Sequence, residues 1–267
     1  MSERKFSGPV VLTIAGFDPS GAAGIIADVR TIQSFRCLPV AAVTSVTFQN
    51  SENYFGAVHQ TAGSVRAQVE AIVGEYEIAA VKIGMLPTAQ IVTEVARLTS
   101  QLDLPAPVVD PVMQSTTGGE LMREDAFQAL VRELLPLTGL LTPNIPEAER
   151  LAGMPIVDEV TMRDAAGRIR ELGVRAVLIK AGHLDEANSA TSSEANDLLH
   201  DGKISMFRGS RIAGAKLRGS GCILSSAIAA GLAKGVSLEN SIQAARDFVT
   251  SALAATPDLD VERAGPA

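Results

Sequence analysis

The stretch Gly219-Ser220-Gly221-Cys222 has the residue types of a site that holds an anion. A Gly-x-Gly turn that opens a helix exposes backbone N–H groups, and the helix dipole adds positive potential there. A phosphate or a developing oxyanion would fit, and a thiol in the first helical turn is predicted to have a lowered pKa. The structural alternative is a tight turn in which Ser220 caps the helix and Cys222 is a small core residue.

Known nucleotide-binding patterns do not explain this stretch. A dinucleotide fingerprint, GxGxxG, needs a third glycine where Leu224 stands, and the Walker A pattern GxxxxGK[ST] does not occur in the chain. The first apolar stretch is also not followed by a dinucleotide fingerprint. An NAD-dependent dehydrogenase is therefore disfavoured.

A second glycine-rich stretch, AGFDPSGAAGIIAD, covers residues 15–28. Gly16, Gly21 and Gly24 would allow the backbone to approach a ligand closely. Asp28 lies within an otherwise apolar helical pattern, where a carboxylate is costly unless it is paired. The alternative is that Asp28 faces solvent on the outer side of its helix.

Oxygen ligands and a lysine follow three further apolar runs. Asp110, Asn144 and Glu147 have the chemistry that suits a hydrated Mg²⁺, and Lys180 could meet phosphate oxygens. Helix capping by the first three residues and a surface position for Lys180 remain alternatives. The three histidines have no metal-ligand spacing and receive no role.

These residues must be positioned by an alternation of strands and helices. The predicted strands are 10–16, 39–49, 78–84, 106–113, 139–144 and 176–183, and a hairpin with an Asp201-Gly202 turn covers 196–208. The predicted helices are 23–35, 64–76, 88–101, 123–134, 146–152, 160–172, 220–234 and 238–255. This alternation predicts a single α/β domain over residues 1–267, with a doubly wound, mostly parallel sheet and helices on both faces. Ligands then bind beyond the carboxyl ends of the strands, where the polar residues above are found.

Composition narrows the class of protein. The chain has 267 residues, 46% of them hydrophobic but only 4% aromatic, so small aliphatic side chains must fill the core. A net charge of −7 argues against nucleic acid or an anionic membrane as the main partner. Cys37 and Cys222 fit neither a disulfide framework nor a CxxC metal site. No stretch approaches the length of a membrane span, and we expect a soluble, cytoplasmic protein.

Seven stretches together resemble one known family. TIAGFDPSGAAGIIADVRT, QN, KIGML, VVDPVM, TPNIPEAE, IKAGH and GSGC occur in the order and spacing of hydroxymethylpyrimidine and phosphomethylpyrimidine kinases. These are thiamine-biosynthesis enzymes of the ribokinase-like superfamily. The resemblance implies an α/β/α sandwich, commonly a homodimer, that uses ATP and Mg²⁺. It would phosphorylate 4-amino-5-hydroxymethyl-2-methylpyrimidine and also its monophosphate, giving the diphosphate.

The resemblance also implies site residues. Cys222 stands where sugar-kinase relatives have the Asp that takes the proton from the substrate hydroxyl, and Gly219, Ser220 and Gly221 would form the anion hole. The implied pyrimidine pocket consists of Gly16, Ala23, Asp28, Gln49, Met85 and Val112. Asp110 and Glu147 would hold Mg²⁺ through water, with Asn144 beside the phosphates of ATP and Lys180 on them.

The chain departs from the family pattern at several positions. Ala22 stands in GAAG where GGAG is usual, Ile26 replaces a Gln, and Thr116 begins a stretch that often carries a Lys. Ser220 replaces Thr, Arg218 stands where His is common, and the C-terminal stretch is reduced to RAGPA. Arg218 could restore a charge near the phosphates. Segments 114–121 and 183–196 are the candidates for closing over the site.

Three alternative functions remain open. A pyridoxal kinase could be built on the same framework, although B6-directed relatives tend to lose the Gln found here at Gln49. A general sugar kinase is disfavoured because Cys222 replaces Asp. A non-catalytic pyrimidine-binding protein would explain the departures, and detectable ATP turnover would exclude it.

Overall fold

A computed structural model describes residues 8–50, 52–115, 118–181, 196–209 and 218–255. Within them one nine-stranded sheet has the order β3-β2-β1-β4-β5-β6-β7-β8-β9. Its strands are β1 (Val10–Phe17), β2 (Leu38–Gln49), β3 (Tyr54–His59), β4 (Ile78–Ile83), β5 (Val108–Val109), β6 (Leu140–Leu141), β7 (Val177–Ile179), β8 (Asp197–His200) and β9 (Ile204–Phe207). The six strands from β2 to β7 in this order are parallel, and β3, β8 and β9 add antiparallel pairs at the two edges. The predicted doubly wound, mostly parallel sheet is confirmed.

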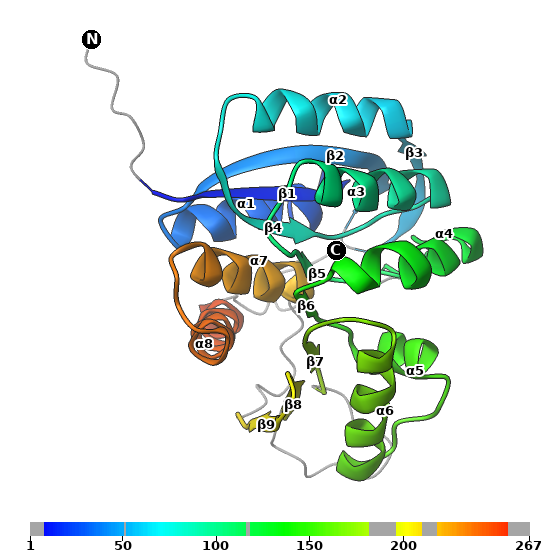
Figure 1. The fold of residues 1–267 in the computed structure, drawn as a ribbon, viewed down its shortest axis with the longest axis vertical. Coiled ribbons are helices and arrows are strands. Elements are labelled where there is room, and N and C mark those ends of the chain that lie inside the picture. Colours follow the sequence, from blue (N-terminus) through cyan, green and yellow to red (C-terminus); the bar gives the residue numbers. More distant parts are fainter. Residues whose placement is uncertain (1–7, 51, 116–117, 182–195, 210–217, 256–267) are drawn as a thin grey trace, which may run out of the picture.

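Helices cover both faces of this sheet (Figure 1). The helices are α1 (Gly24–Ser34), α2 (Ala62–Val73), α3 (Ala89–Gln101), α4 (Glu124–Ala129), α5 (Ile145–Ala152), α6 (Glu159–Glu171), α7 (Ser220–Ala233) and α8 (Leu238–Ala255). One buried cluster joins the sheet to α2, α3, α4, α5 and α6, and a second joins it to α1, α7 and α8. Within β1, Leu12 and Ile14 enter the first cluster and Val11 enters the second, because successive side chains point to opposite faces.

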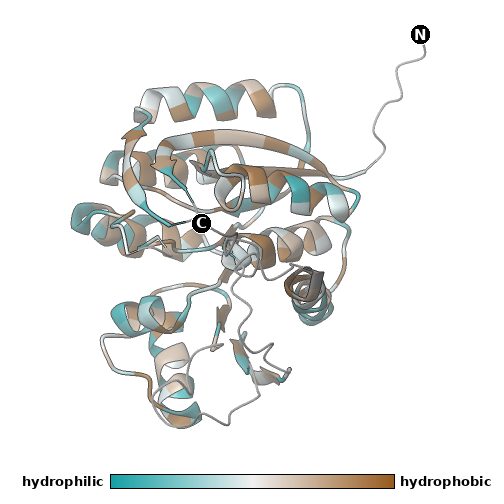
Figure 2. Cartoon of the chain, turned by 180° about the vertical axis from the view of Figure 1, so that it is seen from behind, coloured by the Kyte–Doolittle hydropathy of each residue, from teal (hydrophilic) through white to brown (hydrophobic). Residues whose placement is uncertain are grey.

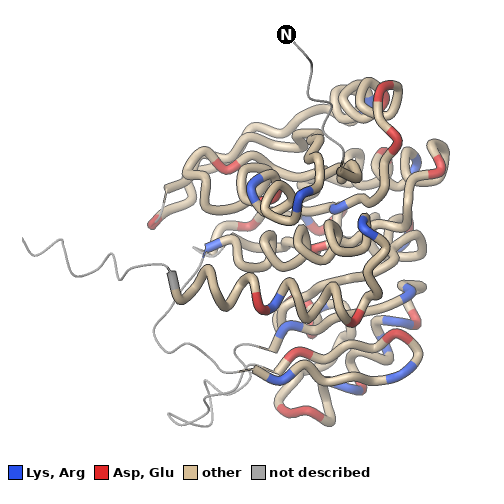
Figure 3. The backbone as a smooth tube through the Cα atoms, turned by 90° about the vertical axis from the view of Figure 1, so that its left-hand side faces the viewer, with Lys and Arg blue, Asp and Glu red and all other residues tan. Residues whose placement is uncertain are grey.

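Hydropathy follows this layering (Figure 2), whereas charges of both signs are distributed along the chain (Figure 3). The long central strands are largely hydrophobic in Figure 2, whereas the outer helices carry hydrophobic and hydrophilic residues side by side. Acidic and basic residues are interspersed along the chain in Figure 3. None of the helices in the described ranges is both long and apolar enough to span a bilayer.

The centre of the sheet contains the point where strand order reverses. The chain passes from β1 to β2 and β3 on one side, and from β4 through β5, β6 and β7 on the other. In doubly wound sheets, the crevice beyond the carboxyl ends of such strands is where ligands bind. A ligand site is therefore expected among the loops that follow the parallel strands, namely those after β1, β2, β4, β5, β6 and β7.

Several predicted boundaries differ from the structure. The strands predicted at 106–113, 139–144 and 176–183 are shorter, because the residues after β5, β6 and β7 leave the ladder and carry the polar groups of the crevice. The helix predicted over 123–134 includes a π turn at Leu130–Leu134 after α4. The hairpin with its turn at Asp201 and Gly202 is confirmed.

Candidate active site

The predicted site residues gather at the carboxyl edge of the sheet. Gly16 lies at the end of β1, Gln49 at the end of β2, Met85 after β4, Asp110 after β5 and Lys180 after β7. Helix α7 packs against β1, β4 and β5 and brings its N-terminus to the same edge. A Cβ built on Gly221 would lie 3.1 Å from Nζ of Lys180 and 3.3 Å from Oδ2 of Asp110. Segments separated by more than 100 residues in sequence therefore meet in one place.

Two glycines permit close backbone contacts at the loop after β1, one with the start of α7 and one with the end of β1. Gly219 has a φ of +75°, and a Cβ there would lie 2.1 Å from the carbonyl oxygen of Ala22. Gly24 has a φ of +57°, and its Cβ would lie 2.2 Å from the carbonyl oxygen of Gly16. In both contacts the approaching group is protein backbone, and the predicted close approach of a ligand to this stretch stays a prediction. Ala22 does not have a positive φ, so the departure from GGAG introduces no backbone strain.

Replacing Gly219 with alanine is expected to lower both activity and stability. The new Cβ would clash with backbone that no rotamer change can move, and φ lies in the left-handed region. We expect a loss of about 2 kcal/mol or more in the free energy of unfolding, measured by urea denaturation, together with a fall in kcat. Gly153→Ala is the matched control, since Gly153 has a φ of +64° but nothing within 4 Å of its Cβ position. Equal costs for the two variants would contradict the importance of the Ala22 contact.

The pKa of the Cys222 thiol differs from the predicted one. Burial raises its pKa to about 11, Lys82 lowers it, and Asp28 and Asp110 add to the rise. A backbone hydrogen bond from Gly24 also favours the thiolate. The predicted lowering of the pKa by the helix N-terminus was wrong, because desolvation and two nearby carboxylates outweigh the dipole.

Asp110, Lys180 and Glu147 form a compact charged group. Nζ of Lys180 donates to Oδ1 of Asp110 at 2.9 Å, and the Asp110 side chain is 4% exposed. Burial lowers the pKa of Lys180, but the Asp110 and Glu147 carboxylates outweigh it and the pKa is raised. Lys180 is thus held as a cation beside Gly221. Its alternative as a plain surface lysine does not fit this placement.

Asn144 and Glu147 also have a structural role, which the capping alternative anticipated. Oδ1 of Asn144 accepts from the backbone N–H of Glu147 at 2.9 Å, and Oε2 of Glu147 accepts from the backbone N–H of Asn144 at 2.8 Å. This capping box opens α5. Burial raises the pKa of Glu147 to about 7, and the Asp110 carboxylate adds to the rise while Lys180 opposes it.

The donor set fits a magnesium ion that arrives with phosphates. The described residues contain no group of three or more side chains able to hold a metal by themselves. Mg²⁺ commonly keeps several waters and is bound through one or two carboxylates plus substrate phosphates. Asp110 and Glu147 supply two carboxylates, both buried and both beside Lys180.

Asp28 is enclosed beneath the site by groups that sequence reasoning did not connect. Nζ of Lys82 lies 2.9 Å from both carboxylate oxygens, and both side chains are fully buried. Thr13 Oγ1 donates at 2.7 Å and Ser226 Oγ at 2.9 Å. The expected pairing of a buried carboxylate is confirmed, and the solvent-facing alternative is wrong. Because protein groups use both oxygens, the geometry supports a role for Asp28 in the floor of the site in place of the predicted substrate contact.

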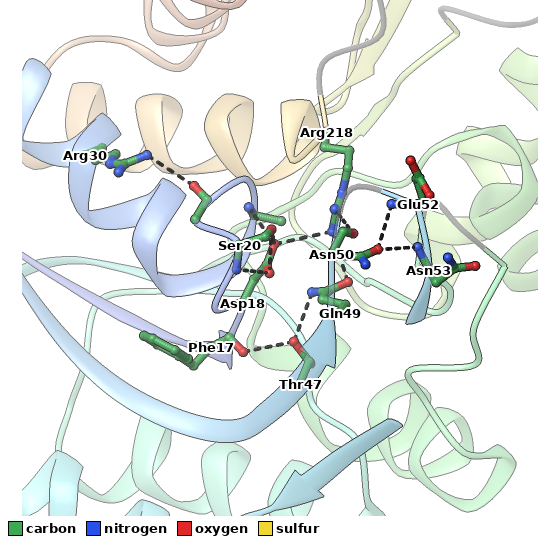
Figure 4. A network of polar contacts seen from close by, with 12 residues as sticks. Phe17, Asp18, Ser20, Arg30, Thr47, Gln49, Asn50, Glu52, Asn53 and Arg218 are labelled. Carbon is green, nitrogen blue, oxygen red and sulfur yellow. Dashed lines mark hydrogen bonds and ion pairs between the residues drawn. The ribbon is translucent and has the colours of Figure 1, made fainter. Parts of the chain in front are cut away.

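Gln49 lies in a polar network at the rim (Figure 4). Its Oε1 accepts from Nη2 of Arg218 at 3.1 Å, and its Nε2 donates to Oγ1 of Thr47 at 3.0 Å. Nη2 of Arg218 also lies 3.4 Å from Oδ2 of Asp18. Asp18 was not among the predicted site residues, although its position between Gly16 and Gly21 in the glycine-rich stretch was a signal for it.

The remaining pocket residues surround this edge. Gly16 packs against Met85, with a Cβ at Gly16 only 2.8 Å from Sδ. The backbone N–H of Ala23 donates to Asp18 at 3.1 Å, and Val112 is half-buried after Asp110. Their contacts with a ligand stay predictions.

The two candidate closing segments are only partly described. Gln114 forms a bridge with Glu120, and a Cβ at Gly119 would lie 2.3 Å from the ring of Tyr54. Residues 116–117 and 183–195 lie outside the described residues, so the Thr116 departure and the second segment are not placed.

Comparisons with known proteins find pyrimidine kinases by sequence, and both a pyrimidine kinase and a pyridoxal kinase by structure. The family model described as phosphomethylpyrimidine kinase matches residues 18–267. A hydroxymethylpyrimidine/phosphomethylpyrimidine kinase from Streptomyces coelicolor is 40% identical over 248 residues, covering 92% of this chain and 89% of the relative. A crystal structure of phosphomethylpyrimidine kinase from Clostridium difficile has a TM-score of 0.80 at 33% identity, covering 92% of this chain and 99% of that one. An ADP complex of Bacillus subtilis pyridoxal kinase has a TM-score of 0.82 at 33% identity, covering 92% of both chains.

Proposed function

This chain belongs to the phosphomethylpyrimidine kinase family, and from that premise we propose that it transfers the γ-phosphoryl group of ATP to 4-amino-5-hydroxymethyl-2-methylpyrimidine. We propose the monophosphate as the second acceptor, which places both steps in thiamine biosynthesis. The proposal is supported above all by the close placement of Gly221, Lys180 and Asp110. This placement combines backbone donors, a buried cation and carboxylates at the carboxyl edge of the sheet.

The residues of this chain supply positioning and electrostatic stabilisation, which account for most of phosphoryl-transfer catalysis. The N–H groups of the Gly219–Gly221 turn and the ammonium of Lys180 bind phosphoryl oxygens. Asp110 and Glu147 would hold Mg²⁺, which supplies further neutralisation of phosphate charge. Asn144 lies beside them at the start of α5.

Cys222 is the proposed proton acceptor. The substrate oxygen bonds to the γ-phosphorus, the bond to the β–γ bridging oxygen breaks with its electron pair passing to ADP, and the hydroxyl proton passes to the Cys222 thiolate. A thiol with a pKa of about 11 is mostly protonated at neutral pH. In a loose transition state little proton abstraction is needed early, so a small thiolate population is sufficient.

A parallel phosphorylation assay tests the proposal. Hydroxymethylpyrimidine, its monophosphate and pyridoxal are each supplied with ATP and Mg²⁺, and phosphorylated product is quantified. We expect the two pyrimidines to be preferred. Preference for pyridoxal would favour the second candidate function, which the likeness to the Bacillus subtilis enzyme supports. Absence of turnover on all three would favour the non-catalytic pyrimidine-binding protein.

Gln49→Met is expected to lower affinity for the pyrimidine while ATP affinity stays unchanged. The amide is the polar group that the predicted pocket offers at its rim, and methionine has a similar length without the hydrogen bonds. Removing one such hydrogen bond is expected to raise KM for the pyrimidine by about tenfold. Initial rates at varied pyrimidine and varied ATP give the two KM values. An equal rise in both would show that Gln49 lies outside the pyrimidine pocket.

The homodimer and the cytoplasmic location also stay proposals. Phe48, Phe55 and Val58 on β2 and β3 are exposed apolar side chains. They provide a surface on which a second copy could pack.

A further inference from the structure

Arg218 contacts two other segments of the chain, the end of β2 and the loop after β1, at the rim of the site (Figure 4). Its guanidinium hydrogen-bonds the carbonyl oxygen of Asn50, the Oε1 atom of Gln49 and a carboxylate oxygen of Asp18. The side chain is 17% exposed, so most of this charged group is buried. The backbone of the next residue, Gly219, opens the turn that we assign to phosphate binding.

These contacts fix the direction of a hydrogen-bond chain. An arginine can only donate, so the Gln49 atom that faces Arg218 must be the carbonyl oxygen. The Nε2 group of Gln49 then points to Thr47, whose hydroxyl donates in turn to the carbonyl oxygen of Phe17 at 3.0 Å. The amide of Gln49 therefore has one orientation, which hydrogen-bond partners on both sides maintain.

The fixed amide has one donor and one acceptor left for a ligand. One N–H of Nε2 and one lone pair of Oε1 remain on the same planar group. A 4-aminopyrimidine presents the complementary pair, an exocyclic amine that donates and a ring nitrogen that accepts. Glutamine reads the similar edge of adenine through two such hydrogen bonds. Rotating the amide by 180° would place donor against donor and acceptor against acceptor.

We propose that Arg218 is a specificity-determining positioning residue, which holds Gln49 in the orientation that pairs with an aminopyrimidine edge. This inference rests on the proposed function and deepens it, because it explains how the substrate class is selected. The carboxylate that Arg218 contacts, Asp18, already accepts hydrogen bonds from residues of its own loop. The oxygens of Asp18 accept from Ser20 and Ala23 at 2.8–3.1 Å, closer than the 3.4 Å to Arg218. The shorter contacts of the guanidinium are with the amide of Gln49 and the backbone of Asn50.

A double-mutant cycle tests this coupling. KM for hydroxymethylpyrimidine and for ATP is measured in the unmodified enzyme, Arg218→Ala, Gln49→Met and the double variant. We expect Arg218→Ala alone to raise the pyrimidine KM by about five- to tenfold, no more than the loss of the Gln49 amide itself, with the ATP KM within about twofold. In the Gln49→Met background the same change is expected to raise the pyrimidine KM by no more than about threefold, since no amide is left to orient.

Two further variants separate positioning from a structural role. Arg30→Ala removes a guanidinium whose Nη1 donates to the carbonyl oxygen of Gly21 in the neighbouring loop, without touching Gln49, and both KM values should stay unchanged. Arg218→Lys keeps a cation and one donor, so we expect an intermediate pyrimidine KM. It also takes the place of Arg218→Ala if that variant does not fold.

Two results would overturn the inference. One is an equal rise in the KM values for ATP and the pyrimidine in Arg218→Ala. The other is a rise in the pyrimidine KM that is the same with and without Gln49. Failure of the unmodified enzyme to phosphorylate the pyrimidine is a separate outcome, which would contradict the proposed function itself.

Discussion

Replacing Cys222 with alanine is expected to lower kcat by about 100- to 10,000-fold, the usual contribution of a general base. Binding of the pyrimidine should survive, because the polar groups of the proposed pocket come from Gln49 and its neighbours. Initial-rate kinetics give kcat, and calorimetric titration with the pyrimidine gives its dissociation constant. Undiminished turnover would show that the thiol is not the base.

The pH dependence gives a second readout of the same assignment. A base acts in its deprotonated form, and burial raises the pKa of the Cys222 thiol to about 11. The active fraction of the unmodified enzyme should therefore rise about tenfold per pH unit between pH 7 and 10, as expected below the pKa of a single group. Cys222→Ala should lose this slope, and an identical slope in both enzymes would contradict proton transfer to the thiol.

Cys37→Ala is the matched control for this pair of measurements. Cys37 is fully buried against α7, where its Sγ contacts the carbonyl oxygen of Ala230 at 3.5 Å. Ala230 lies near the C-terminal end of α7, whereas the turn at Gly219 lies at its N-terminal end, so Cys37 is distant from the proposed site. We expect its removal to lower stability through a small cavity while kcat and the pH slope are kept.

Asp28→Ala is expected to lower the free energy of unfolding by about 3–5 kcal/mol, the cost of leaving a buried charge without its partner. Lys82 is fully buried, and its two short contacts with the carboxylate are the ion pair that compensates its charge. Burial would lower the pKa of Lys82, but Asp28 outweighs it with help from Cys222 and Asp110, so the pKa is raised and the ammonium persists. Urea denaturation measures the change.

The control for Asp28→Ala removes both charges together. Asp28→Leu combined with Lys82→Met places apolar side chains of similar volume in the same space and should recover most of the lost stability. A loss below about 1 kcal/mol in the single variant would contradict a strongly coupled ion pair. So would a double variant as unstable as the single one.

The order of strands and helices could be predicted because apolar runs alternate regularly along the chain. The antiparallel strand β3 was missed. It lies at the edge of the sheet, where Phe55 and Val58 are exposed and Gly56 interrupts the alternation with a φ of +137°. Burial on one face, the signal that periodicity detects, is weak there.

The site was predicted where a residue type is informative by itself, and missed where partners are distant in sequence. Asp28 looked anomalous in the apolar pattern of α1, but nothing in the spacing shows that it meets Lys82 of β4. The contact between Arg218 and Gln49 joins residues 169 positions apart. The pKa of Cys222 was predicted in the wrong direction, because desolvation depends on the packing around the thiol and a local motif does not show it.

The contact between Ala22 and Gly219 has a consequence for engineering. Their backbones are so close that a side chain at Gly219 finds no room, although almost 200 residues separate them along the chain. A loop exchange that alters only one of these segments would destroy the match with the other. Transferring the specificity of a relative to this scaffold therefore requires that residues 16–24 and residues 218–222 are exchanged together.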